Sequence, residues 1–163
     1  MPCWPIRVYT GRGRDEVDKI ALADINNDGK TEVFTYGDYN CRKIFAFDYQ
    51  GNPLSGWPVT LKLEGAWDTV GISGISIADL NGNGTKEVVV RPDTNEIFVY
   101  NSIGKVLRHF HYSMLRHRTH TNIDLTPAIG DIDNDGSNEI VANTVNMGTA
   151  FSAIYAWDLP GIN

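Results

Sequence analysis

Three short stretches of the chain place oxygen-bearing side chains at alternate positions, followed by a glycine and then a glutamate. They read DINNDGKTE, DLNGNGTKE and DIDNDGSNE, and they begin at Asp24, Asp79 and Asp131, 55 and then 52 residues apart. Carboxylates crowded this closely repel one another unless a positive charge lies between them. Each stretch therefore predicts a cation-binding loop.

The spacing of the oxygens favours Ca²⁺, which takes six to eight oxygen ligands from carboxylates, amides, backbone carbonyls and water. Glycine at position 6 permits the sharp bend that aims the oxygens at one point. Side chains at positions 1, 3, 5 and 9, with the backbone carbonyl of position 7, form the predicted ligand set. These positions are Asp24, Asn26, Asp28, Lys30 and Glu32; Asp79, Asn81, Asn83, Thr85 and Glu87; and Asp131, Asp133, Asp135, Ser137 and Glu139.

Other readings of the loops fit less well. An EF-hand needs a glutamate at position 12 and flanking helices, but position 12 is Thr35, Val90 or Ala142. Mg²⁺ prefers a strict octahedron with several waters, and Zn²⁺ prefers His or Cys. A plain hairpin turn rich in Asp, Asn and Gly explains one loop better than three in one register. Up to three calcium ions are therefore predicted, with affinity falling from the third loop to the first to the second as carboxylates give way to amides.

Short alternating apolar runs on both sides must position these loops. KIALA (19–23), GISIA (74–78) and TPAIG (126–130) precede them, and a further run follows each one. Period-2 alternation, β-branched and aromatic residues, and Gly or Asn punctuation predict strands, and no sustained helical period occurs. The later runs are KIFAFD (43–48), EIFVYN (96–101) and AIYAWD (153–158).

The repeat divides the chain into three modules, at approximately 3–55, 56–108 and 109–163, within a single repeat domain. The pattern of an apolar strand, D-x-[DN]-x-[DN]-G-x-x-E, an IFAFD-like strand, a glycine turn and GWP resembles the FG-GAP, or VCBS-like, repeats of integrin-like β-propellers. The resemblance implies an all-β fold of three consecutive four-stranded blades, with Ca²⁺ in the loop between the first two strands of each.

Three blades are too few to close a propeller, which typically needs four to eight. The open strand edges invite pairing with other blades or with copies of the same chain. We therefore expect either a segment of a longer protein or an assembly, in which two chains form a six-bladed ring or many chains form a filament.

Composition narrows the remaining possibilities. The chain has 163 residues and a formal net charge of −6, which gives no electrostatic reason to expect nucleic acid, and no apolar run is long enough to span a membrane. Two cysteines, Cys3 and Cys41, leave open a single disulfide or two free thiols. Millimolar calcium outside cells and the habits of the family favour an extracellular or cell-surface location.

Two features lie outside the repeat pattern. The segment 108–122 carries all four histidines, and we read it as a solvated strand and loop rather than a transition-metal site, because no cysteine or carboxylate cluster lies near it in the sequence. Trp67 either covers a junction between blades or stacks on a sugar ring.

Motifs for catalysis are missing: there is no G-x-S-x-G, no H-E-x-x-H and no phosphate-binding glycine loop. The sequence thus predicts a non-catalytic extracellular scaffold or adhesion module. A carbohydrate-binding propeller and a non-catalytic part of a polysaccharide-active enzyme are the alternatives.

Overall fold

The computed structural model describes most of the chain. Trp67, both cysteines, His117 and His120 lie outside the described residues, so the predictions that concern them stay predictions. The described residues are 4–8, 17–37, 42–63, 71–94, 96–111, 126–143 and 153–162.

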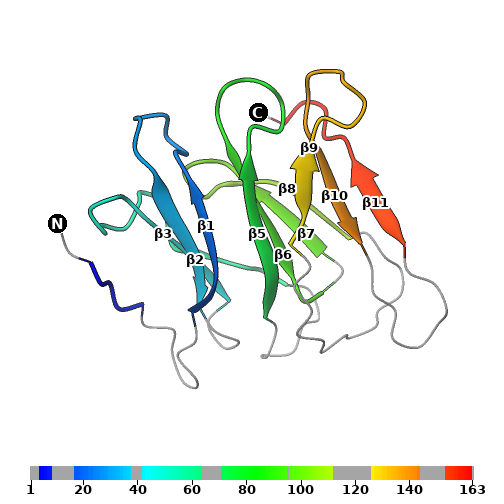
Figure 1. Ribbon diagram of the computed structural model, residues 1–163. Helices are drawn as coiled ribbons and strands as arrows, with labels where there is room; N and C mark the ends of the chain where they lie inside the picture. Colours follow the sequence, from blue (N-terminus) through cyan, green and yellow to red (C-terminus); the bar gives the residue numbers. More distant parts are fainter. Residues whose placement is uncertain are drawn as a thin grey trace.

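Within these ranges, eleven strands form three antiparallel sheets that stand side by side (Figure 1), and we refer to each sheet as a blade. Blade 1 has the order β1-β2-β3-β4, blade 2 the order β5-β6-β7-β8, and blade 3 the order β11-β10-β9. The described residues contain no helix, which confirms the all-β prediction with three consecutive blades. The strands are β1 (Val17–Ala23), β2 (Glu32–Gly37), β3 (Lys43–Phe47), β4 (Val59–Thr60), β5 (Ile72–Ala78), β6 (Glu87–Pro92), β7 (Glu96–Tyr100), β8 (Val106–His111), β9 (Ala128–Gly130), β10 (Glu139–Asn143) and β11 (Ile154–Trp157).

Blade 3 differs from its neighbours because three strands, not four, are described in it. Residues 144–152, between β10 and β11, lie outside the described part of the chain. Blades 1 and 2 have the four strands that the sequence predicts, although β4 is only two residues long. No helix in the described ranges is long and apolar enough to cross a membrane.

Each blade packs face to face against the next because alternate residues of a strand point to opposite faces. Phe34 of β2 lies opposite Ala21 and Ala46 in the register, and this face packs against blade 2. Trp57 fills the same interface, with its ring centroid 5.2 Å from that of Phe34 and 6.0 Å from that of Tyr100. The first apolar core therefore lies between blades, not within one.

A second core of the same kind lies between blades 2 and 3. It joins Val89, Ile97 and Val99 of blade 2 to Ile140 and Ala142 of β10, and all five side chains are buried. Blade 2 consequently has apolar residues on both faces, and β6 and β7 are buried along their whole length. The blades thus form a row in which the middle one is covered on both sides.

Candidate metal-binding loops

The three acidic loops connect the first and second strands of their blades. They join β1 to β2, β5 to β6 and β9 to β10, and they lie along the same edge of the row (Figure 1). Because each loop closes an antiparallel hairpin, the strands on either side fix where its oxygens converge. The strand–loop–strand arrangement predicted from the sequence is confirmed at all three places.

The first loop is held by hydrogen bonds from its own backbone to its acidic side chains. Asp24 accepts from the backbone N–H of Asp28 through Oδ1 at 3.0 Å and from that of Gly29 through Oδ2 at 2.9 Å. Asn26 Oδ1 also accepts from the Asp28 N–H at 3.0 Å, and Asp28 Oδ1 accepts from the Lys30 N–H at 2.9 Å. These bonds turn the side chains at positions 1, 3 and 5 toward the inside of the loop.

The same bonds recur in the other two loops. The position-1 aspartates, Asp79 and Asp131, accept from the position-5 N–H at 3.1 and 3.2 Å and from the position-6 glycine N–H at 2.7 and 3.0 Å. The three position-6 glycines have φ of +82°, +86° and +93°, which L side chains rarely adopt. The sharp bend that the sequence analysis assigned to this glycine is therefore present in all three loops.

The glutamate at position 9 is buried in all three loops, which the sequence did not reveal. One carboxylate oxygen of Glu32, Glu87 and Glu139 accepts from the position-2 backbone N–H at 2.9, 2.9 and 2.8 Å. The other oxygen, Oε1, of Glu32 and of Glu139 is buried with no hydrogen-bond partner among the described residues. A buried carboxylate oxygen without a donor is costly unless a cation fills its place.

Burial also acts on the protonation of Glu32 and Glu87 in the metal-free protein. Burial raises the pKa of Glu32, and the nearby carboxylates of Asp28 and Asp24 raise it further, against the hydrogen bond from Ile25. Burial likewise raises the pKa of Glu87. In the third loop, carboxylate oxygens of Asp131, Asp133 and Glu139 lie within 4.8 Å of one another, a separation that suits a shared metal ion.

Neighbouring loops are tied to each other through one repeated position. The Lys86 Nζ, at position 8 of the second loop, donates to the carbonyl oxygen of Asp24 at 2.9 Å. At the same position of the third loop, Asn138 Nδ2 donates to the carbonyl oxygen of Asp79 at 2.7 Å. In both cases position 8 of one loop reaches position 1 of the loop before it. The loops therefore form a connected row.

Removing a position-8 side chain should loosen this connection. We expect Lys86→Met and Asn138→Ala each to lower the free energy of unfolding by about 1–2 kcal/mol, the usual scale for losing one such hydrogen bond. Thr31, at position 8 of the first loop, is exposed and provides the matched control. Chemical denaturation of Thr31→Ala should give the wild-type value, and an equal loss in all three variants would contradict the role assigned to the connection.

Of the predicted ligands, the structure brings the carboxylates of Asp131, Asp133 and Glu139 together. The Lys30 side chain, at position 7 of the first loop, points elsewhere. Its Nζ lies 4.6 Å from the centroid of the Tyr49 ring, consistent with position 7 having no side-chain role in the loop. The sequence analysis also missed a buried carboxylate, Glu96, that faces His109 and His111. The register of the β7–β8 hairpin carries that signal, because Glu96 pairs directly with His111.

Comparison with known proteins agrees with this geometry. Residues 24–90, which include the first two loops, match the FG-GAP-like repeat family. The V. cholerae biofilm matrix protein Bap1 is 25% identical over 76% of this chain and 17% of its own, with a TM-score of 0.50. This chain therefore spans only about a sixth of the Bap1 chain. A search of curated proteins found no significant match.

Two further solved structures are more distant. The pore of the Photorhabdus luminescens Tc holotoxin is 13% identical over 78% of this chain and 6% of its own, with a TM-score of 0.48. BBS1N in complex with ARL6DN is 15% identical over 76% and 36%, with a TM-score of 0.43. The resemblance predicted from the loops is confirmed over part of the chain: residues 24–90, with their two acidic loops, match the FG-GAP-like repeat family.

Proposed function

We propose that the chain is a calcium-stabilised, non-catalytic module of an extracellular structural protein, and that it assembles with further copies of itself. The observation that carries the calcium proposal is the buried Oε1 atom of Glu32 and of Glu139, which has no hydrogen-bond partner in the described part of the chain and lies at the base of a loop lined by oxygens. A cation there supplies the positive charge that these oxygens lack.

The donor set distinguishes calcium from other metals. All side-chain donors in the three loops are carboxylate or amide oxygens, with no histidine or cysteine. Hard cations of flexible coordination prefer such a set, whereas zinc prefers nitrogen and sulfur. Calcium would be held by positions 1, 3, 5 and 9 of each loop, and its role is structural because it neutralises the loop and fixes the hairpin.

The extracellular and structural parts of the proposal draw on Bap1, a biofilm matrix protein with which this chain shares 25% identity. Calcium outside cells is abundant enough to fill even weak sites. The carboxylates clustered in the described loops already serve as metal donors, so the proposal gives them no catalytic task. In this proposal the module has a structural role and not a catalytic one.

The outer face of blade 1 supports the assembly proposal. Ile20 and Leu22 of β1 point to this face and are 67% and 63% exposed. The residues in their place in blade 2, Ile75 and Ile77, pack in the core against blade 1. The outer face of blade 1 therefore carries the side chains of an interface that is covered one repeat later.

Trp4 and Trp57 occupy the same position of the repeat, and they too pair an exposed site on blade 1 with a covered one at the interface between blades 1 and 2. The indole N–H of Trp57 donates to the carbonyl oxygen of Ser102 at 3.0 Å, and that of Trp4 donates to the carbonyl oxygen of Tyr49 at 3.1 Å. Trp57 is buried between two blades, whereas Trp4 is 44% exposed. On the Trp4 side of blade 1, the tryptophan therefore makes the same hydrogen bond as at the interface between blades 1 and 2, but no described blade packs over it.

The outer face of blade 3, at the opposite end of the row, is also exposed where the equivalent face of blade 2 is covered. Ile132, at position 2 of the third loop, is 63% exposed, while Leu80 at the same position of the second loop is buried beneath blade 3. Ile154 of β11 is 80% exposed, and its equivalent in β7, Ile97, is fully buried. This face of blade 3 resembles the face of blade 2 that blade 3 already covers.

The occupant that fits both open faces is a second copy of the chain, with its third blade on the first blade of the next copy. Such a contact repeats the packing between blades 1 and 2 and between blades 2 and 3. It is heterologous, so it gives a ring where the rotation closes and a filament where it does not.

Charge placed on either open face should prevent assembly. In calcium buffer we expect sedimentation velocity to show wild-type oligomers that grow with protein concentration, and Leu22→Asp and Ile154→Asp to be monomeric. Ile103→Asp is the matched control because Ile103 is equally exposed, at 60%, but lies in the turn between β7 and β8. A wild-type monomer at all concentrations would refute self-assembly, and dissociation by the control would refute its assignment to these two faces. Neither outcome affects the calcium proposal.

A further inference from the structure

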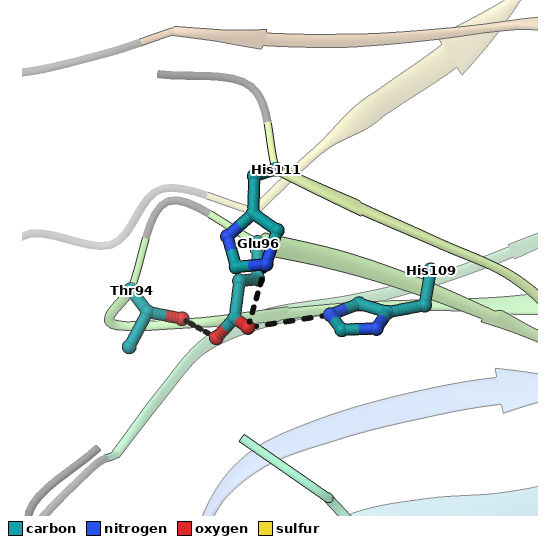
Figure 2. Close-up of polar contacts among 4 residues, drawn as sticks. All are labelled: Thr94, Glu96, His109 and His111. Atoms are coloured by element: carbon teal, nitrogen blue, oxygen red, sulfur yellow. Dashed lines mark hydrogen bonds and ion pairs between the residues drawn. The ribbon is translucent and has the colours of Figure 1, made fainter. Parts of the chain in front are cut away.

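Blade 2 gathers two histidines and a carboxylate at one end of its outer hairpin (Figure 2). The Glu96 Oε1 lies 3.2 Å from the Nε2 of His109 and 3.6 Å from the Nε2 of His111. The ligand atoms of the three residues all lie within 4.8 Å of one another. Two strands therefore bring two imidazole nitrogens and one carboxylate oxygen to a common point.

The register of the hairpin explains this arrangement. Glu96 begins β7 and pairs with His111 of β8, while Phe98 pairs with His109. Glu96, Phe98, His109 and His111 consequently share one face of blade 2. The His109 ring stacks on Phe98, with centroids 4.0 Å apart and planes 9° apart, which fixes the direction of its nitrogens.

Glu96 is positioned as metal-binding carboxylates usually are. Its side chain is 2% exposed, while those of His109 and His111 are 27% and 52% exposed. The Thr94 hydroxyl donates to the second carboxylate oxygen, Oε2, at 2.5 Å, so Oε1 alone faces the histidines (Figure 2). A hydrogen bond of this kind orients a ligand and strengthens its metal site.

The cluster is not a requirement of the blade. In blade 1 the position that begins the third strand is Lys43, and it pairs with Thr60 of β4. A lysine there removes the carboxylate, and threonine replaces the histidine, yet the blade still forms. Since the fold does not need these side chains, their convergence in blade 2 calls for another explanation.

We propose that Glu96, His109 and His111 bind a late first-row divalent metal ion, for which zinc is the probe of choice. Zinc takes imidazole nitrogen and carboxylate oxygen at about 2.0–2.2 Å, so two ligands of a tetrahedral site lie about 3.4 Å apart. The observed separations of 3.2 and 3.6 Å are close to this value. The exposed histidines leave the remaining coordination positions open to water or to a further ligand.

A bound metal ion would also compensate the buried negative charge of Glu96. In the described part of the chain, its ion-pair partners are the two histidines, which carry a positive charge only when protonated. A dication neutralises that charge, binds through both Nε2 atoms and clamps the edge strand β8 to β7. The site differs chemically from the acidic loops because two of its three donors are nitrogen.

Isothermal titration with zinc, in buffer with excess calcium to keep the acidic loops filled, tests the proposal. Saturable binding of one zinc ion is expected for the wild type. His109→Gln and His111→Gln should each weaken it by at least about 10–100-fold, since changes that only disturb an outer-shell partner already cost that much. Cobalt(II) absorption in the visible range, lost in the same variants, provides a second readout of nitrogen coordination.

Arg108→Gln is the matched control, because Arg108 lies on the same strand but pairs with Val99 on the opposite face. Removing its positive charge should leave zinc affinity unchanged or slightly stronger. Glu96→Gln should also weaken zinc, and if that variant unfolds, the exposed His111 variant decides alone. Wild-type zinc affinity in both histidine variants, or no saturable binding to the wild type, would overturn the proposal and indicate an ion pair between Glu96 and the histidines.

Discussion

Removing calcium with EGTA should lower the melting temperature of the chain by more than about 10 °C. A site at 100 times its Kd contributes about 2.7 kcal/mol to the free energy of unfolding, and in a domain of 150–250 residues each kcal/mol shifts the melting temperature by about 2–4 °C. One such site therefore gives a shift of about 5–11 °C, and two or three together exceed 10 °C.

The physical reason lies in the buried glutamates as much as in the exposed aspartates. Without a cation, the Glu32 and Glu139 carboxylates each keep a buried oxygen that lacks a donor among the described residues, close to other acidic groups of the same loop. Unfolding then releases these charges into water. Calcium reverses the balance because it binds the folded loop far better than the unfolded chain.

Differential scanning calorimetry in calcium, in EGTA and in EGTA with excess calcium restored provides the measurement. Magnesium in place of calcium serves as the control, since it tolerates this irregular set of ligands less well and should restore only part of the shift. An unchanged melting temperature in EGTA would rule out a structural role for calcium.

The second large effect on the free energy of unfolding is expected for Glu32→Gln, which replaces one carboxylate oxygen with an amide nitrogen. In calcium we expect a loss of about 2–3 kcal/mol, because the amide keeps the shape of the carboxylate but forfeits the metal's binding energy. In EGTA this loss of stability should disappear, or the variant should become more stable than the wild type. The reason is that an amide avoids the desolvation of a buried charge and the repulsion by Asp28 and Asp24. Denaturation curves of both proteins in both buffers yield the comparison.

The effect of pH in EGTA follows from the raised pKa of Glu32. Because the folded-state pKa lies above the unfolded value, the wild type is relatively most stable below the unfolded pKa. It loses that stability as pH rises through the folded pKa. Glu32→Gln lacks this dependence, so the difference between the two proteins should grow with pH in the weakly acidic range and level off above it.

Asp48→Asn is the matched control for Glu32→Gln. Asp48 lies in the turn after β3, outside the acidic loops, and accepts from the backbone N–H groups of Gln50 and Asn52 at 2.8 Å. Although burial opposes it, bonds from Asn52, Gln50 and Gly51 lower the pKa of Asp48. The loss in Asp48→Asn should be the same in calcium and in EGTA, and a calcium-dependent loss there would undermine the assignment of Glu32 to the metal site.

The acidic loops and their strands could be predicted from the sequence because both rest on local rules. A D-x-[DN]-x-[DN]-G spacing limits the backbone of a turn, and alternation such as that of Ile20 to Ala23 identifies strand faces. Each depends on residues within about ten positions of one another. The repeat then confirms each local prediction twice more.

What the sequence could not show depends on contacts that form only in the folded chain. Glu32, Glu87 and Glu139 look like surface acids in a polar turn, yet all three are buried at the base of their loops. Glu96 is more than a dozen residues from the histidines it faces, and their meeting depends on the register across a hairpin that also contains an irregularity between Val99 and Tyr100.

The two position-8 bonds between successive loops run the same way, from Lys86 back to the Asp24 carbonyl and from Asn138 back to the Asp79 carbonyl. The row of blades therefore has polarity, with a donor position at one terminus, occupied by the short Thr31, and an acceptor carbonyl, that of Asp131, at the other. Any growing array built by this rule would have chemically different ends. An isolated copy of one end could then cap growth in one direction only.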